Sequence, residues 1–169
     1  MKTEINPKEL NDNFFKAIGE EWMLVAAGNK DKFNMMTASW GGTGIMWGKP
    51  VVFVFIRPER YTREFMDQEG TFSISFMGDN KEVHKICGSK SGRDTDKVAE
   101  TGLTPCFGES GIPCFEESRL TLECKILYRE TLSKEAFLDK GLHDMWYNDK
   151  KGNLHIMYVA EILKAEKAQ

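Results

Sequence analysis

The amino-acid sequence predicts a mainly β fold, an antiparallel barrel with appended helices, formed by one domain over residues 1–169. Short apolar or alternating runs typical of strands recur along the chain, and helical patterns come singly between them. Strands and helices do not alternate regularly, as they would in a doubly wound sheet, and no Gly-rich dinucleotide fingerprint follows a strand. A barrel with helices packed on it buries such elements best.

The N-terminal half is predicted to combine two capped helices with short strands. A helix begins at Asn6, an N-cap followed by Pro at the first helical position, and its apolar spacing continues to about Gly19. Pro58 opens the second helix and Gly70 ends it, whereas the glycines Gly41, Gly42 and Gly44 are expected to interrupt the strand pattern. In this half we expect strands at Trp22–Ala27, Phe33–Trp40, Val51–Ile56 and Phe72–Phe76, a turn at Gly28–Asp31 and the second helix at residues 59–68.

The C-terminal half is predicted to be richer in turns and to contain the longest strand. Ser73 and Ser75 alternate with apolar residues, so the strand that leads into this half is expected to be half-buried. Asp94 is the expected cap of a short helix, and residues 102–117 are turn-rich with short strands. We expect helices at Asp79–Cys87, 94–99 and 133–140, the longest strand at Arg119–Glu130 and a last strand at Leu154–Leu163.

The charge balance excludes several classes of function. The chain has 23 Lys and Arg against 26 Asp and Glu, a net charge of −3 and a pI near 5.7, which does not favour binding to nucleic acid or to an acidic membrane. The N-terminal residues lack the apolar core of a secretory signal, and the apolar run Val51–Ile56 is far too short to cross a bilayer. We therefore expect a soluble, cytoplasmic protein whose 4 cysteines are free thiols.

Polar residues interrupt the predicted strand that ends at Trp40. The segment Asn34–Trp40 reads Asn-Met-Met-Thr-Ala-Ser-Trp, a mixture poorly suited to a plain core. Such a strand can line a flat heteroaromatic ligand, with backbone donors and acceptors along its edge. An ordinary strand with its polar residues in water fits the same pattern, and the segment alone favours that simpler interpretation.

Two short segments are positively charged within this mildly acidic chain. Residues 57–63 hold three Arg and one Glu, a balance of 3 − 1 = +2, and residues 83–93 hold three cations and no acid, which gives +3. Arg57 and Arg60 flank a helix start, where unpaired N–H groups and the helix dipole favour an anion, and Thr62 adds a hydroxyl. The Gly-containing loop 88–93, with Lys97 behind it, adds further donors but lacks the P-loop spacing. Both segments suit one small phosphate, and surface ion pairs or a solvated loop explain them as well.

The histidines and cysteines show no catalytic arrangement that the sequence can identify. His84 and Cys87 are spaced for one helix face, but no second pair follows, so a zinc site is not favoured. His143 and His155 fit either a polar contact at the mouth of a pocket or a position on the surface.

Five segments, taken in order, resemble the flavin reductase-like, FMN-binding split-barrel family, which includes the flavoredoxins. The last of them resembles the family's G-D-H…G-E-V signature, from which it departs at Asn153-Leu154 and at Ala160. The similar segments span nearly the whole chain and are Asn34–Trp40, Arg57–Thr62, Thr71–Phe76, residues 91–94 with Asp96 and Lys97, and His155–Ile162.

The resemblance implies a homodimer of Greek-key split barrels that binds FMN in a groove near the subunit interface. The residues implied around the flavin ring and ribityl chain are Asn34, Met35, Met36, Thr37, Ala38, Ser39 and Trp40, with Tyr61 packing on the ring or its edge. Those implied around the phosphate are Arg57, Arg60 and Thr62, helped by Ser89, Arg93 or Lys97. His143 is implied as a further flavin-side contact and His155 as a nicotinamide-side residue.

The implied function is an FMN-binding oxidoreductase that moves hydride or electrons from NAD(P)H or a redox protein through the flavin. A flavin supplies the redox chemistry itself, which explains why the sequence shows no strong catalytic set of side chains. Two alternatives stay open. One is a non-catalytic FMN electron carrier of the flavoredoxin kind, and the other is a binding barrel for another phosphorylated ring compound, such as pyridoxal phosphate.

Overall fold

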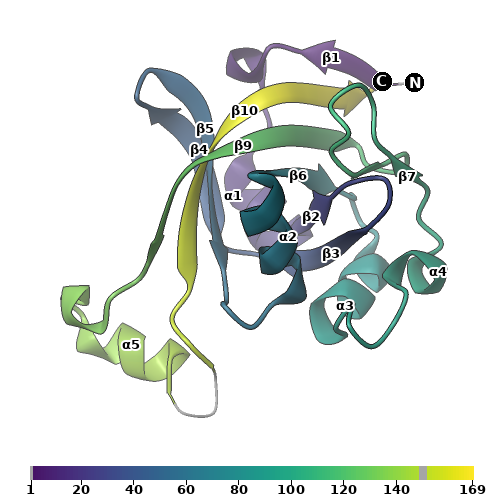
Figure 1. The fold of residues 1–169 in the computed structure, drawn as a ribbon. Coiled ribbons are helices and arrows are strands. Elements are labelled where there is room, and N and C mark those ends of the chain that lie inside the picture. Colours follow the sequence, from purple (N-terminus) through teal and green to yellow (C-terminus); the bar gives the residue numbers. More distant parts are fainter. Residues whose placement is uncertain (1, 149–151) are drawn as a thin grey trace.

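The computed structural model describes residues 2–148 and 152–169 and confirms the mainly β fold. Its strands curl into a barrel with helices on the outside and at the openings (Figure 1). The strands are β1 (Lys2–Ile5), β2 (Met23–Gly28), β3 (Phe33–Ala38), β4 (Gly41–Met46), β5 (Lys49–Ile56), β6 (Thr71–Phe76), β7 (Pro105–Cys106), β8 (Cys114–Phe115), β9 (Leu120–Thr131) and β10 (Ile156–Ala168). The helices are α1 (Phe14–Lys16), α2 (Tyr61–Glu69), α3 (Lys81–Ser89), α4 (Lys97–Thr101) and α5 (Lys140–Trp146), with 3₁₀ turns at Pro7–Glu9 and Lys134–Ala136 and a π-helical turn at Ala17–Glu21.

One antiparallel sheet forms the barrel, in the order β3-β2-β6-β9-β10-β5-β4, and β1 adds to β10. Register shifts between β9 and β10, at Val159/Ala160 and Ile162/Lys164, mark bulges in these two long strands. Between these strands, residues 132–148 and 152–155 project away from the barrel and carry α5; we call these described residues the arm (Figure 1). Among the described residues, no helix is long and apolar enough to cross a membrane.

Two apolar clusters lie on opposite faces of the sheet. Side chains such as Val25 and Met36 point into the barrel, where they pack with Phe65 and Met66 of α2. The alternate residues Leu24 and Met35 point outward and pack beneath α3 and the β7–β8 hairpin. Strand β2 is therefore buried along its whole length, and the first turn of α2 lies beside the edge strand β3.

Local signals in the sequence predict several of these elements correctly. The turn after β2 closes with a hydrogen bond from the Asn29 N–H to the Lys32 carbonyl, at 2.9 Å. Gly70 ends α2 in the left-handed conformation, with φ = 70°, which a residue without a Cβ adopts at little cost.

The expected interruption at Gly41–Gly44 is wrong, because these residues form β4 against β5. A Cβ on Gly41 would lie 2.2 Å from the Phe53 carbonyl oxygen, so here glycine permits a close strand pairing rather than a break.

The N-terminal segment differs from the single helix that the sequence predicts. Asn6 does act as a cap, and its side chain accepts from the Lys8 N–H at 3.0 Å. The helical turn ends at Glu9, however, and a second helical segment starts only after Asn13, which caps the Lys16 N–H at 3.3 Å. Strand β1 ahead of it was not predicted, since its four residues owe their conformation to pairing with the end of β10.

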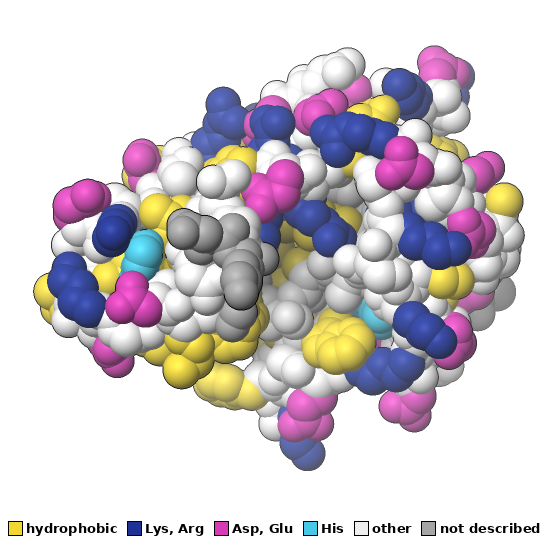
Figure 2. All heavy atoms as spheres, turned by 90° about the horizontal axis from the view of Figure 1, so that it is seen from below, with side chains coloured by type: hydrophobic (Ala, Val, Ile, Leu, Met, Phe, Trp, Pro, Cys, Tyr) yellow, Lys and Arg dark blue, Asp and Glu magenta, His cyan; other side chains and the backbone are white. Residues whose placement is uncertain are grey.

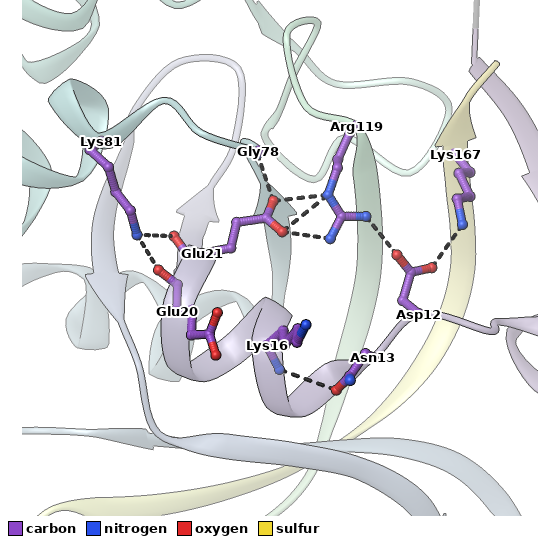
Figure 3. Close-up of polar contacts among 9 residues, drawn as sticks. All are labelled: Asp12, Asn13, Lys16, Glu20, Glu21, Gly78, Lys81, Arg119 and Lys167. Carbon is purple, nitrogen blue, oxygen red and sulfur yellow. Dashed lines mark hydrogen bonds and ion pairs between the residues drawn. The ribbon is translucent and has the colours of Figure 1, made fainter.

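A network of charges fastens this N-terminal segment to the barrel (Figure 3). The Arg119 guanidinium on the barrel lies 2.6 Å from a carboxylate oxygen of Asp12 and 2.6 Å from one of Glu21. Lys167 of β10 binds the other oxygen of Asp12 at 2.9 Å, and Lys81 of α3 donates to the Glu21 carbonyl at 3.3 Å. Four separate parts of the chain thus meet at one point.

Four further expectations for the C-terminal half need correction. Asp96, not Asp94, caps α4, because its carboxylate accepts from the Val98 and Ala99 N–H groups at 3.0 and 3.1 Å. Ser73 and Ser75 are fully buried rather than exposed, since segment 103–115 covers that face of β6. The predicted helix at 133–140 is only the 3₁₀ turn, whereas α5 lies where a connection was expected, and β10 at 13 residues is longer than β9 at 12.

Candidate functional site

A groove runs along the edge of β3, between the start of α2, the end of α3 and the arm. It consists of two adjoining cavities of about 140 and 330 Å³, and Met36 and Arg60 line both. We call the smaller one the polar end and the larger one the aromatic end. Figure 2 shows the hollow from below, between the arm on the left and the barrel on the right, with Lys and Arg side chains inside it. The polar end is lined by Asn34, Met36, Glu59, Arg60, Tyr61, Thr62, Ser89, Lys90, Ser91, Gly92 and Lys97, and the aromatic end by Met36, Thr37, Ala38, Ser39, Trp40, Phe55, Arg57, Arg60, Trp146 and His155.

The polar end is built on the first turn of α2. This nine-residue helix has no side-chain cap at its N-terminal position, Arg60, and the N–H groups of Tyr61 and Thr62, two residues that line the cavity, have no intrahelical partner. The fully buried Thr62 accepts from Asn34 Nδ2 at 2.9 Å, which leaves the Thr62 hydroxyl proton to donate. Helix dipole, N–H groups and hydroxyl together favour an anion at this place.

The buried Lys97 and the half-buried Arg60 add positive charge to the polar end. Arg60 donates to the carbonyls of Cys87 and Gly88 at 3.1 and 3.0 Å, and Lys97 donates to those of Met35 and Cys87 at 2.7 and 3.1 Å. Burial lowers the pKa of Lys97 to about 8, with Arg60 contributing, and burial also lowers the pKa of Arg60. Neither cation forms an ion pair with a carboxylate within residues 2–148 and 152–169. An anionic ligand would therefore gain from both charges.

The loop after α3 closes the polar end against β3. A Cβ on Gly92 would lie 2.0 Å from Asn34 Oδ1, so only glycine lets the loop approach this closely. Ser89 donates to the Lys85 carbonyl at 2.6 Å. Arg93 pairs with Glu64 and stacks 4.5 Å from the Tyr61 ring centroid, where it lines a neighbouring cavity together with Met35.

The aromatic end is a box of rings held by the arm. The Trp40 ring lies 4.9 Å from that of Trp146 and 4.8 Å from that of His155. Arg57 ties the arm down, because its guanidinium donates to the carbonyls of Asn153 and Trp146 at 2.8 and 3.2 Å. The structure thus places Arg57 among the rings rather than beside Arg60 at the polar end.

Most of the residues that the sequence singles out come together in this groove, although they derive from five separate segments. His143 does not line it: the ring lies on the arm, 3.1 Å from Asp144 and against Phe137. His84 and Cys87 do not face one another as metal ligands; His84 Nδ1 lies 2.9 Å from Thr37 Oγ1, and no cluster of three or more candidate ligands occurs in the described part of the chain.

Sequence reasoning missed two wall residues of the aromatic end. Phe55 belongs to the apolar run Val51–Ile56, which predicts a buried strand and nothing about a ligand site. Trp146 follows His143 in an aromatic cluster, and it lies on α5, a helix that the sequence did not predict. The aromatic pair Trp146-Tyr147 was the available signal.

A larger cavity of about 720 Å³ lies on the other side of Ser39 and Trp40, between the N-terminal helical segment and the start of β4. Its one charged lining residue among those described, Asp12, is already held by Arg119 and Lys167. This chemistry does not suit a phosphate, so the smaller groove is the better candidate for a phosphorylated ligand.

The fold and the groove together define a split barrel with a candidate site for a phosphorylated aromatic ligand. The chain belongs to the flavin reductase-like family, because the family's sequence model, the flavin reductase like domain, matches residues 15–167. No protein of curated function matches it significantly.

Solved structures share the fold at low identity. Flavoredoxin of Desulfovibrio vulgaris superposes with a TM-score of 0.67 at 24% identity, over 88% of this chain and 69% of that one. An FMN-binding domain of flavin reductase-like enzymes from Shewanella baltica superposes with a TM-score of 0.70 at 18% identity, over 99% of this chain and 77% of that one. The NADH:FAD oxidoreductase SgcE6 of Streptomyces globisporus superposes with a TM-score of 0.63 at 15% identity, over 88% of this chain and 75% of that one. At these identities the likeness shows the fold.

Proposed function

We propose that the groove binds FMN, with the phosphate at the polar end and the flavin ring at the aromatic end. The observation that carries this proposal is the direct junction, at Met36 and Arg60, of an anion-binding helix start with a box of aromatic rings. A phosphorylated flavin needs this combination, an anionic group at one end and a flat ring at the other. The cavity sizes together fall within the ~300–1,000 Å³ common for small-molecule sites.

Each end offers donors that match its proposed occupant. At the polar end, the Thr62 hydroxyl, the first N–H groups of α2 and the Arg60 guanidinium would hold the phosphate, and Lys97 adds charge behind them. At the aromatic end, Trp40 and the edge of β3 from Met36 to Ser39 would border the ring. Bound FMN would supply the redox chemistry, and the protein would tune it through charge and hydrogen bonds.

The activity we propose is transfer of hydride or electrons from NAD(P)H, or from a redox protein, through this flavin. Similarity to an NADH:FAD oxidoreductase supports the first source. Similarity to flavoredoxins supports the second candidate function, a non-catalytic electron carrier. Both would use the same groove, so the residues around it do not separate them.

The test begins with the absorption spectrum of the purified protein and the mass of any ligand released on denaturation. We expect a flavin spectrum and the mass of FMN; another phosphorylated ring compound, such as pyridoxal phosphate, would overturn the assignment. Anaerobic titration with NADH and NADPH then separates the two activities. Bleaching within seconds supports the reductase, whereas a flavin that stays oxidised but accepts electrons from a ferredoxin-like donor supports the carrier.

We propose that a second copy of the chain packs against the exposed face of β4 and forms a dimer. Ile45 on this edge strand and Trp47 in the turn after it are 64% and 56% exposed, and Phe15, beside the 720 Å³ cavity, is 94% exposed. An exposed apolar face on an edge strand is typical of an interface. Ser39 and Trp40 line both this cavity and the groove, so a partner seated there would touch the wall of the flavin site.

Sedimentation of the wild-type protein and of an Ile45→Asp, Trp47→Asp variant tests the dimer. We expect the wild type to sediment as a dimer and the variant as a folded monomer. A wild type that stays monomeric at high concentration would refute the proposed interface.

A further inference from the structure

Two cysteines face each other across the β7–β8 hairpin, outside the groove. Strand β7 pairs antiparallel with β8 so that Cys106 and Cys114 are directly opposite, and both are free thiols in this structure. Directly opposite residues of an antiparallel pair have Cα atoms ~4.5–5.5 Å apart and side chains on the same face. A disulfide needs a Cα separation of ~4.4–6.8 Å, so the backbone already holds these two residues within bonding range.

Both thiols line one cavity of about 290 Å³, which shares no lining residue with the groove. Cys106 is half-exposed, whereas Cys114 is 4% exposed and donates its S–H to Glu123 Oε1 at 3.9 Å. The other charged residues of the lining are Lys2, Lys164, Glu116 and Glu166. A small polar reagent can therefore enter this cavity and reach the pair through Cys106.

The environments of the two thiols set the order in which they react. Burial raises the pKa of both, and the Glu123 carboxylate adds to the rise for Cys114, whose pKa reaches about 12. Cys106, the more accessible of the two, is therefore the first to react with a reagent from solution. Once Cys106 carries a second sulfur, Cys114 lies directly across the ladder from it, and a reaction within the chain outpaces one with another molecule.

We propose that Cys106 and Cys114 are a modification site, at which a low-molecular-weight disulfide such as oxidised glutathione converts the two thiols into a reversible cross-strand disulfide. In the first step the Cys106 thiolate attacks one sulfur of the reagent, which forms a mixed disulfide and releases one glutathione. In the second step Cys114 loses its proton to solvent and attacks Cys106 Sγ, which releases the second glutathione. The two protein thiols lose two electrons and the reagent gains them, so the exchange balances.

The new bond would close a ring over the turn of the hairpin that covers β6. Phe107 in this turn meets Phe33 of β3 edge to face, with 5.5 Å between ring centroids, and the Pro113 carbonyl accepts a hydrogen bond from the Ser73 hydroxyl. A cross-link removes conformational freedom from the unfolded chain more than from a turn that is already packed. For a ring of this size the melting midpoint of the oxidised protein should rise by about 5 °C.

Mass spectrometry of the full-length protein after incubation with oxidised glutathione at about pH 8.5 tests the site. We expect the wild type to lose the mass of two hydrogens, to yield a peptide that joins Cys106 to Cys114, and to regain both thiols in dithiothreitol. Cys114→Ser should stop at the mixed disulfide, with one glutathionyl group on Cys106, and Cys106→Ser should stay reduced at this hairpin. The matched control Cys87→Ser, which removes a buried thiol on α3, should form the same bond as the wild type.

The wild type alone decides the outcome, so the test does not depend on a variant that folds. A wild type that stays reduced, that keeps a glutathionyl group on Cys106 without closing, or whose peptide map joins another pair of cysteines would overturn the proposal. The melting midpoint adds a second criterion. A rise that dithiothreitol abolishes supports a bond that fits the native hairpin, whereas a fall would show that the bond distorts the hairpin and would contradict the proposed site.

Discussion

Replacing Arg60 with alanine is the sharpest test of how the groove recognises a phosphate. Arg60 lines both ends of the groove and has two hydrogen bonds to the carbonyls at the end of α3. A guanidinium has about five N–H donors, so several remain for a ligand after those two. A charge-assisted hydrogen bond to phosphate contributes ~1.5–3 kcal/mol, which corresponds to about a 10- to 150-fold rise in the Kd of FMN.

The matched ligand for this experiment is riboflavin, which has the same ring and no phosphate. Fluorescence titration should show the loss in Arg60→Ala for FMN alone, with riboflavin bound equally by variant and wild type. Arg129→Ala removes an arginine that is 55% exposed and pairs with Asp67, and it should change neither Kd. If Arg60→Ala weakens both flavins to the same extent, Arg60 supports the loop after α3 rather than the phosphate. If it weakens neither, the phosphate lies elsewhere.

Three further predictions concern stability and the thiols. Arg119→Met leaves the carboxylates of Asp12 and Glu21 without their shared partner and should cost ~1–3 kcal/mol in urea unfolding, a value reduced by the partial exposure of the pair; an unchanged midpoint would show that the network adds nothing. Burial, with Lys81 nearby, lowers the pKa of His84 from 6.5 to about 4, so between these values the unfolded chain binds a proton that the folded one excludes. The free energy of unfolding should therefore fall as the pH is lowered through this window, and it should fall less in His84→Gln; an equal fall in both proteins would contradict the buried neutral ring. Burial also raises the pKa of the Cys87 thiol to about 11 and that of Cys114 to about 12, so both should react slowly with a disulfide reagent at neutral pH, and single serine variants should keep the flavin activity; rapid labelling of either would point to a reactive thiol.

Local signals predicted those parts of the fold that depend on a few neighbouring residues. The cap at Asn6, the turn after β2 and the end of α2 at Gly70 all involve hydrogen bonds that close within four residues, and the sequence contains both partners. The same holds for the Ser133 side chain, which caps the Ala136 N–H. The order of the segments was enough to suggest the family, which the match over residues 15–167 now shows.

Strand partners could not be predicted in this way. The glycines of β4 look like an interruption, because their strand exists only through its pairing with β5. Ser73 and Ser75 look like an exposed face, because nothing near them in the sequence indicates that segment 103–115 covers it. In both cases the deciding contact joins residues far apart along the chain.

By itself the sequence determined the fold class and the positively charged segments, since composition and spacing carry that information, and its resemblance to a family indicated most of the residues that line the groove. Only the tertiary structure decided what each of them does there. Arg57 and Arg60 are equivalent in the sequence, but one fastens the arm and the other lies between the two ends of the groove. Tyr147 and His155 become a pair because the end of α5 lies beside the start of β10. The environment of a side chain is set by distant segments, and the packing of the barrel and arm brings those segments together.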